Sequence, residues 1–252
     1  IVVLNSNRGD ILDSNLNLLA GTRILYHLYA YKPQFDNDQS IYTSSLAEIL
    51  TTHLATSSAQ DRELETLTTQ NFLTKRLSID SNWISLKHYL TRQQKEKIED
   101  LKLAGLGFEE EPVRFYPEAS NSAHLLGFVG DDLAGQPQGY FGLEGYYDRQ
   151  LRGREGRILA EKDALGNPIL IGRFNLLKNI SGRSIVTTID KNKQFLIEKG
   201  LEEGLIKYQA RAGNVILMET NTGRILAMAS LPNYDPSHFQ DFAKESYKNP
   251  NI

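Results

Sequence analysis

Cysteine is absent from the 252-residue sequence, and tryptophan occurs only once. Without thiols the chain can form neither disulfides nor cysteine–zinc sites, and it has no thiol nucleophile. This composition is compatible with an extracytoplasmic location, where stray thiols are a liability. It does not require that location, because many cytosolic proteins also lack cysteine.

Long apolar runs and an excess of one charge are also missing. No run approaches the roughly 18 apolar residues of a membrane span. The 28 basic and 31 acidic residues give a net charge of −3, so we expect no nucleic-acid partner. The chain starts at Ile1 without methionine and without the organisation of a signal peptide, so we expect an upstream segment to have been removed.

The signatures of self-contained catalysis are absent too. The sequence contains no Gly-x-Ser-x-Gly, no Ser-x-x-Lys and no Lys-Thr-Gly, which excludes a complete serine enzyme of these types. No two of the five histidines lie three or four residues apart, so we expect no metal site. Gly139, Gly142 and Gly145 do not have the spacing of a phosphate-binding loop, so we expect no nucleotide cofactor.

Two carboxylates nevertheless stand out in the stretch GYFGLEGYYDRQLRGREG, residues 139–156. Glu144 and Asp148 are four residues apart, which places them on one face of a helix. They could be an acid/base pair, half of a metal site, or acids at a helix start that are paired with arginines. Several arginines follow closely, and this favours the structural interpretation.

The predicted secondary structure changes twice in the first half of the chain. Residues 1–20 predict an extended segment, a turn and a short strand. Residues 41–105 predict helices, interrupted by a short strand from Trp83 to Leu90. Capping boxes predict helix starts at Ser45, Ser58 and Thr91, and Gly105 is expected to end the last of these helices.

The second half predicts shorter elements. A strand is expected over residues 113–117, a short helix over 142–153 that Gly153 closes, and a hairpin over 156–172 that turns at Gly166-Asn167-Pro168. Asp190 is expected to cap a helix that runs to Tyr208. A further antiparallel hairpin should turn at Asn221-Thr222-Gly223. We therefore predict an α+β fold: an elongated mixed β pedestal with a helical lobe at about 41–105, followed by an incomplete antiparallel sheet and helix.

Three separated segments resemble the conserved motifs of class B penicillin-binding proteins. Residues 7–13, with Leu19-Ala20, resemble the Arg-Gly-x-Ile-x-Asp…Leu-Ala opening of that family. Residues 114–118 resemble its Arg-x-Tyr-Pro motif, and residues 139–153 resemble Gly-x-x-Gly-x-Glu-x-x-x-Asp-x-x-Leu-x-Gly. Their order and spacing also resemble the family. Beyond residue 187 the chain resembles the start of a transpeptidase domain.

The resemblance implies a peptidoglycan D,D-transpeptidase as the parent protein, with a serine that forms an acyl-enzyme. It implies a pedestal (dimerisation) domain at residues 1–180 and the start of the transpeptidase at 181–252, ending before the catalytic serine. We therefore assign no catalytic, cofactor-binding or metal-binding residue and predict that this stretch is inactive. The implied partners are peptidoglycan stem peptides and β-lactams, through the missing catalytic domain, and a polytopic glycan-polymerising membrane protein. The implied location is the outer face of the bacterial cytoplasmic membrane, held by an anchor that precedes this chain.

The family motifs also predict a structural node. We expect Arg8 and Arg114 to converge on Glu144 and Asp148, because the planar guanidinium can hold a carboxylate with two hydrogen bonds. We further expect this node to lie at the junction of the pedestal and the transpeptidase domain. One departure from the family concerns the turn after Asp13, where Leu16 replaces glycine and tolerates a positive φ poorly. The predicted structural residues are Arg8, Gly9, Asp13, Arg114, Tyr116, Pro117, Gly127, Gly142, Glu144, Asp148, Leu151 and Gly153.

Two other functions compete with this one. The chain could be a stand-alone, non-enzymatic interaction module of pedestal type. The helical lobe could bind a partner, or its apolar faces could simply pack on one another. The chain could also be a carboxylate-dependent hydrolase that uses Glu144 and Asp148. The second of these requires an open cleft beside the two acids.

Overall fold

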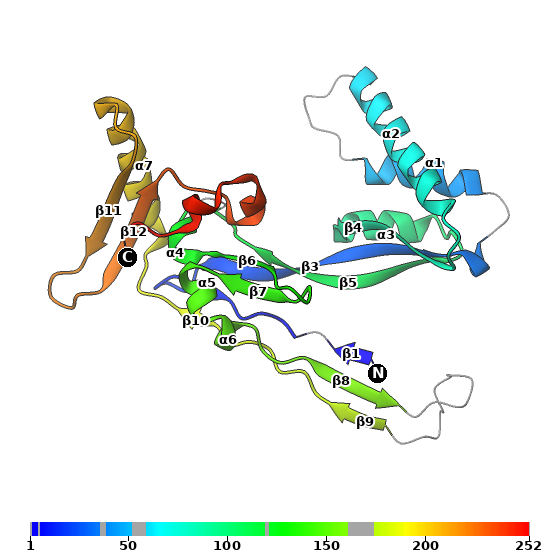
Figure 1. Cartoon of the computed structure of the whole chain (residues 1–252), viewed down its shortest axis with the longest axis horizontal. Helices are drawn as coiled ribbons and strands as arrows, with labels where there is room; N and C mark the ends of the chain where they lie inside the picture. Colours follow the sequence, from blue (N-terminus) through cyan, green and yellow to red (C-terminus); the bar gives the residue numbers. More distant parts are fainter. Residues whose placement is uncertain are drawn as a thin grey trace. The chain divides into compact units, whose positions relative to one another are not determined.

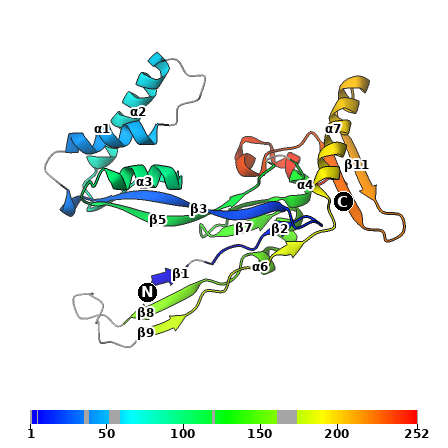
Figure 2. The ribbon, with the colours of Figure 1, turned by 180° about the vertical axis from the view of Figure 1, so that it is seen from behind.

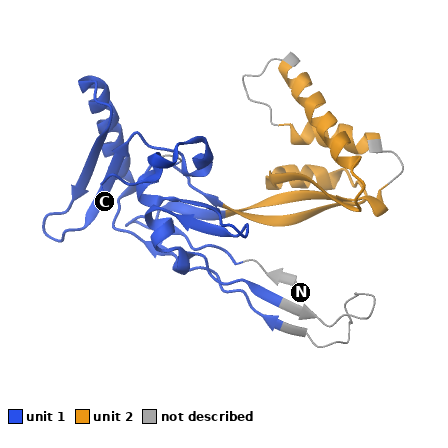
Figure 3. Ribbon diagram, in the orientation of Figure 1, with its two compact units in different colours: residues 1–22, 114–252 blue, residues 23–113 orange. Residues whose placement is uncertain are grey.

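The computed structural model describes residues 2–4, 6–35, 39–51, 59–118, 121–160 and 174–251. These residues form an α+β fold with several sheets, as the sequence predicts (Figures 1 and 2). The chain divides into two compact units (Figure 3): unit 1 contains residues 1–22 and 114–252, and unit 2 contains residues 23–113. The domain boundary expected after residue 180 is a different division and stays a prediction.

Unit 2 is built on three strands. The long strand β3 (Leu18–Tyr31) enters it from unit 1 and pairs with β4 (Trp83–Leu90) and with β5 (Leu106–Phe115). The strand predicted from Trp83 to Leu90 is therefore confirmed. The strand predicted at residues 113–117 is the end of a longer one, since β5 begins at Leu106 and ends before Tyr116.

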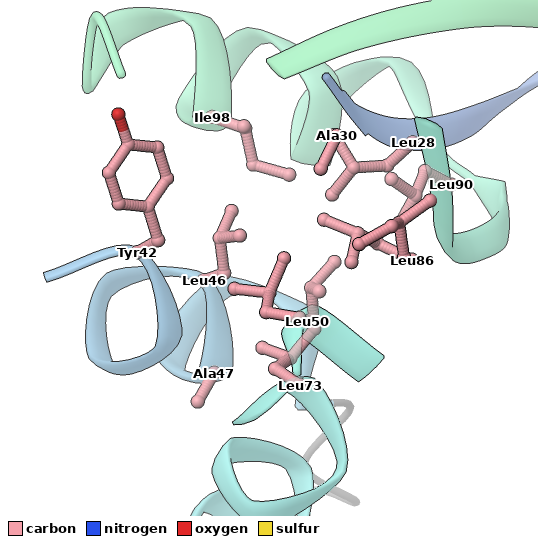
Figure 4. Packing of buried hydrophobic residues seen from close by; sticks show 12 residues of the cluster. Leu28, Ala30, Tyr42, Leu46, Ala47, Leu50, Leu73, Leu86, Leu90 and Ile98 are labelled. Atoms are coloured by element: carbon pink, nitrogen blue, oxygen red, sulfur yellow. The ribbon is translucent and has the colours of Figure 1, made fainter. Parts of the chain in front are cut away.

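Helices pack on one face of this sheet. They are α1 (Gln39–Leu50), α2 (Ala59–Leu77) and α3 (Arg92–Asp100), and a short 3₁₀ helix η1 (Lys32–Gln34) follows β3. Their apolar faces and the inward side chains of the strands form one buried cluster (Figure 4). Its members are Leu28, Ala30, Tyr42, Leu46, Ala47, Leu50, Leu73, Leu77, Ile84, Leu86, Leu90 and Ile98.

The helix signals of unit 2 have mixed outcomes. The capping box at Thr91 is confirmed, because Thr91 and Gln94 exchange both hydrogen bonds. The helix start predicted at Ser45 is wrong: α1 already runs from Gln39, and Ser45 lies inside it. The expected role of Gly105 is also wrong, because α3 ends at Asp100 and Lys102 takes the left-handed conformation with φ 51°. The start predicted at Ser58 lies outside the described residues.

Unit 1 begins with strands that pair with distant segments. The predicted hairpin is present as β8 (Gly156–Ala160) and β9 (Phe174–Leu177), which are antiparallel, and β1 (Val2–Leu4) pairs with β8. Its second strand lies later than expected, and its predicted turn falls outside the described residues. The short strand β2 (Ile11–Leu12) pairs with β3 and, in parallel, with β10 (Ile185–Val186).

Compact turns and short helices follow β5 in unit 1. They are α4 (Ala123–Leu126), the paired strands β6 (Phe128–Asp131) and β7 (Pro137–Tyr140), α5 (Gly142–Tyr146) and α6 (Asp148–Leu151). The single helix predicted over 142–153 is thus two helices, because the backbone of Tyr147 leaves the helical region with φ −100° and ψ 17°. Gly153 follows with φ +72° and ends this segment, as predicted.

The last part of unit 1 agrees closely with the sequence. Helix α7 (Lys191–Tyr208) is capped by the Asp190 carboxylate, which accepts hydrogen bonds from the backbone N–H groups of Asn192 and Lys193. The antiparallel hairpin of β11 (Gly213–Met218) and β12 (Ile225–Leu231) follows. Two 3₁₀ helices, η2 (Pro236–Asp241) and η3 (Lys244–Tyr247), complete the described chain.

Two buried clusters hold unit 1 together. One joins residues of the N-terminal segment, the residue after β5, α4, α6 and the residue before the cap of α7: Ile11, Leu19, Ala20, Tyr116, Leu126, Leu151 and Ile189. The other joins α4 and β6 to the C-terminal segment through Ala123, Phe128, Tyr234 and Tyr247. Unit 1 is therefore built from segments that are far apart in the sequence.

Candidate functional site

Four charged side chains of unit 1 meet in a node of ion pairs. Arg8 lies just before β2, Arg114 near the end of β5, Glu144 in α5 and Asp148 at the start of α6. Arg8 Nε donates to Glu144 Oε2 at 2.7 Å, and Arg8 Nη1 donates to Asp148 Oδ1 at 2.7 Å. Arg114 Nε donates to Glu144 Oε1 at 2.6 Å. The predicted convergence of these four residues is observed.

The side chains of the node also form hydrogen bonds with backbone groups. Arg114 Nη1 donates to the carbonyl of Gly9 at 2.8 Å, and Arg8 Nη2 donates to the carbonyl of Glu144 at 3.1 Å. Asp148 Oδ1 accepts a bond of 2.8 Å from the N–H of Gly139. Because charged groups contribute to all of these bonds, they are stronger than bonds between neutral groups.

Burial makes the node a structural element. The Glu144 side chain has no exposed surface, and the side chains of Arg8 and Arg114 are 9% and 5% exposed. A buried carboxylate is costly unless it is paired and fully hydrogen-bonded. Both oxygens of Glu144 are bonded to arginine, so the pairing meets this requirement.

Two of the predicted glycines allow two backbone segments beside the node to pack closely. Gly127 has φ +75° and Gly142 has φ +45°. Residues other than glycine rarely adopt these backbone conformations. A Cβ on Gly127 would overlap the carbonyl oxygen of Phe141, and a Cβ on Gly142 would overlap that of Leu125. The two glycines therefore allow the chain around residue 126 to approach the start of α5, which carries Glu144.

The other predicted residues surround the node without joining it. Tyr116 and Leu151 belong to the buried cluster that also contains Ile11. Burial, together with the negative charge of Glu144, raises the pKa of Tyr116 well above its ordinary value. Pro117 comes directly after this tyrosine, where β5 has ended.

Asp13 organises a turn rather than the node. Its buried carboxylate accepts bonds from the backbone N–H of Asn15, Asn17 and Lys191 and from the amide of Asn17. Leu16 adopts φ 66° in this turn and its side chain is 66% exposed. The expectation that leucine would disfavour the turn is therefore wrong: the hydrogen bonds to Asp13 fix the loop, and the side chain lies in solvent.

The contribution of this turn to stability should fall at acid pH. Burial alone would raise the pKa of Asp13, but the hydrogen bonds from Asn17, Lys191 and Asn15 hold it below the ordinary 3.8. A pKa that is lower in the folded chain stabilises the fold above about pH 4, and this contribution is lost as the pH falls through the folded pKa. We expect Asp13→Asn to cost about 1.5–3 kcal/mol at pH 7 and to flatten the decline of stability between pH 5 and 3, as measured by urea unfolding. Parallel curves for the two proteins would contradict the assignment.

The geometry does not suit acid/base chemistry. A catalytic acid must reach the atom that it protonates, and Glu144 is fully buried with both oxygens engaged. A cavity of about 370 Å³ in unit 1 lies between Glu118, Ser122 and Leu126 and the start of α7, and neither Glu144 nor Asp148 lines it. Glu144 is therefore not the accessible acid that the hydrolase hypothesis requires.

Two features are absent from the described residues. Among them, no group of three or more histidines, aspartates and glutamates is placed to hold a metal ion. Within the same residues, no helix combines the length and the apolar character needed to cross a bilayer.

Sequence reasoning missed the way in which the C-terminal segment is held. Tyr234 donates to the carbonyl of Ala123 at 3.0 Å, and the ring of Phe128 stacks on that of Phe239 with centroids 4.0 Å apart. His124 Nε2 lies 2.9 Å from the carbonyl oxygen of Ser246, and burial lowers its pKa. The only signal in the sequence was the number of aromatic residues in both segments, and that number does not specify the partners.

Known proteins resemble this chain in sequence. The sequence model described as the penicillin-binding protein dimerisation domain matches residues 3–187. Peptidoglycan D,D-transpeptidase FtsI of Escherichia coli strain K12 is 32% identical over 168 residues, which are 65% of this chain and 28% of that protein. Stage V sporulation protein D of Bacillus subtilis is 28% identical over 240 residues, which are 95% of this chain and 34% of that protein. The chain thus spans about a third of the length of these relatives.

Solved structures share the fold. Penicillin-binding protein 2X from Streptococcus thermophilus superposes with a TM-score of 0.68 at 23% identity, over 98% of this chain and 37% of that one. A complex between penicillin-binding protein 2 and MreC from Helicobacter pylori gives a TM-score of 0.63 at 18% identity, over 100% of this chain and 47% of that one.

Proposed function

Since the chain belongs to the penicillin-binding protein dimerisation domain family, we propose that it is the non-catalytic pedestal portion of a peptidoglycan D,D-transpeptidase. In this proposal residues 1–180 form the pedestal and residues 181–252 begin the transpeptidase domain. The pedestal positions the catalytic domain and engages the cell-wall machinery. The protein acts at the outer face of the cytoplasmic membrane.

The observation that carries this proposal is the buried ion-pair node. A node in which two arginines bridge an N-terminal segment, the end of β5 and two short helices gives rigidity and presents no reactive group. The carbonyl of Gly9 accepts a hydrogen bond from Arg114. The N–H of Gly9 donates to the carbonyl of Leu151 at 2.8 Å. A platform that supports another domain needs such a rigid arrangement, whereas a catalytic site needs access.

The partners follow from the same proposal. Stem peptides and β-lactams would bind the catalytic domain of the complete protein and not the pedestal. The pedestal itself would bind proteins of the wall-synthesis machinery, in the way that penicillin-binding protein 2 of H. pylori forms a complex with MreC. A polytopic glycan-polymerising membrane protein is the second partner of this kind.

A labelled penicillin tests the proposal. The 252 residues contain no Ser-x-x-Lys sequence, so we expect no covalent label on this chain under conditions that label the complete gene product stoichiometrically. Heat-denatured complete protein is the control for non-specific labelling. Stoichiometric acylation of the 252-residue chain would refute the assignment of a non-catalytic role.

The alternative of a stand-alone interaction module makes a different prediction. If the reading frame after the codon for Ile252 reaches a serine nucleophile of the Ser-x-x-Lys type, the chain is part of a transpeptidase. A stop codon at that point would favour the interaction module.

A further inference from the structure

One face of the sheet in unit 2 carries no helix among the described residues. Helices α1, α2 and α3 pack against the face that bears Leu28 and Ala30 (Figure 4), and Ile84 belongs to the same buried cluster. Successive side chains of a strand alternate between faces. Tyr29 and Tyr31 of β3 and Trp83 and Ser85 of β4 therefore lie on the opposite face. The register agrees, because Tyr29 pairs with Ser85 and Tyr31 with Trp83.

Aromatic rings form a continuous row on this open face. The rings of Tyr29 and Trp83 stack with centroids 5.7 Å apart, and the edge of Trp83 meets His27 at 5.7 Å. His27 stacks on His88 at 3.9 Å, and His88 contacts Tyr89 at 5.9 Å. We call these five rings the aromatic row: His27, Tyr29, Trp83, His88 and Tyr89.

The row is accessible through Trp83, His88 and Tyr89, which are exposed, whereas His27 beneath them is buried. Trp83 is 45% exposed and Tyr89 is 62% exposed. A Cβ on Gly107 of β5 would overlap the ring of Tyr29, so the glycine leaves space for this ring to lie over the neighbouring strand. Three exposed rings that surround a buried one are unusual on a surface without a partner.

Carboxylates border the row on the side of β5. Glu109 Oε2 lies 3.4 Å from His27 Nδ1, and the Glu109 side chain is 59% exposed. Glu111 Oε1 lies 2.9 Å from His88 Nδ1, and its other oxygen accepts from the N–H of Tyr89 at 3.1 Å. Glu111 is therefore held within the sheet, whereas most of the Glu109 side chain is exposed to solvent.

From this juxtaposition we propose that the aromatic row and Glu109 form a docking surface for a protein partner that presents lysine or arginine side chains. The faces of tryptophan and tyrosine rings attract cations through their quadrupole, and a carboxylate attracts the same groups. The two features therefore select one kind of occupant. An acidic partner would be repelled by Glu109, and a purely apolar partner would leave this carboxylate desolvated without a counter-charge.

This proposal rests on the proposed function, because it gives the chemistry of one partner of the pedestal. The two fail separately. The penicillin assay examines acylation, whereas the docking surface is tested by direct binding to the 252-residue chain. Acylation of the chain would overturn the proposed function alone, and failure to bind the lysine peptide would overturn the docking surface alone.

Trp83 is the only tryptophan in the sequence, so its indole N–H resonance reports on this surface without ambiguity. The ¹⁵N-labelled chain is titrated with an acetylated, amidated peptide that alternates lysine and alanine. We expect a saturable shift of the Trp83 indole signal. The same peptide with glutamate in place of lysine, and a tetramer of N-acetylglucosamine, should leave the signal unchanged.

A pair of matched variants locates the charge. Glu109→Gln should weaken the binding of the lysine peptide about threefold, as expected for a largely exposed ion pair. Glu110→Gln removes the same charge from the next residue, which points to the other face of β5, and should leave the affinity unchanged. The absence of a saturable shift, equal weakening by both variants, or an equal response to the glycan tetramer would overturn the proposal.

Discussion

Replacing Glu144 by alanine is expected to lower the free energy of unfolding by about 3–5 kcal/mol. The substitution removes a fully buried carboxylate and leaves the side chains of Arg8 and Arg114, which are 9% and 5% exposed, without their main counter-charge. An uncompensated buried charge costs more than the lost ion pair itself. Urea unfolding of the purified chain measures the difference. Glu155→Ala is the matched control, since this exposed acid should change stability by less than about 0.5 kcal/mol.

The coupling within the node separates it from a general loss of packing. In a double-mutant cycle, Arg8→Ala and Glu144→Ala should together cost clearly less than the sum of the single changes, because either change alone already breaks the shared bond. We expect an interaction energy of about 1–3 kcal/mol. Additive effects would show that the 2.7 Å contact between Arg8 and Glu144 does not stabilise the chain.

The second large effect is expected at Gly182. A Cβ at this position would overlap the carbonyl oxygen of Leu151 and would lie 2.7 Å from the backbone nitrogen of Gly9. Those two atoms belong to a backbone hydrogen bond of 2.8 Å that holds the N-terminal segment to the end of α6. Gly182→Ala should therefore separate the segments and destabilise the chain by about 3 kcal/mol, at the upper end for overpacking.

A second glycine provides the comparison. Gly204 lies within α7, and a Cβ there would meet no atom within 4 Å. Gly204→Ala should stabilise the helix by about 0.5–1 kcal/mol, because alanine loses less conformational entropy. Both changes are measured as shifts in the urea midpoint. If both variants shift the midpoint in the same direction and to a similar extent, close packing at residue 182 is not the cause.

The ion-pair node could be predicted because charge imposes a strict requirement. Arginines and carboxylates in separate segments, each next to glycine or proline, satisfy one another only if the segments meet, and the resemblance to a family gave the pairing. Local signals also sufficed for the caps at Thr91 and Asp190, because the residues that form them are within four positions.

Other features depend on contacts that no local signal contains. Ser45 has the sequence of a helix start, but Tyr42 and Leu46 on either side are both buried in the core of unit 2, so packing continues the helix through it. Gly105 does not end α3, but it has φ +78°, which favours glycine, and a Cβ there would lie 2.7 Å from the Phe35 ring. The stacking of Phe128 on Phe239 joins positions more than a hundred residues apart, and aromatic composition alone cannot specify such a pair.

The discontinuity of unit 1 has a consequence for the order of events during synthesis. Every residue of unit 2 lies between Arg23 and Val113, so its core is complete as soon as that stretch has left the ribosome. Arg8, in contrast, finds its partner 136 positions later in the chain, which at ordinary translation rates is a delay on the order of ten seconds. During that interval Arg8 lacks both of its carboxylate partners, Glu144 and Asp148, and unit 2 can fold before these ion pairs form.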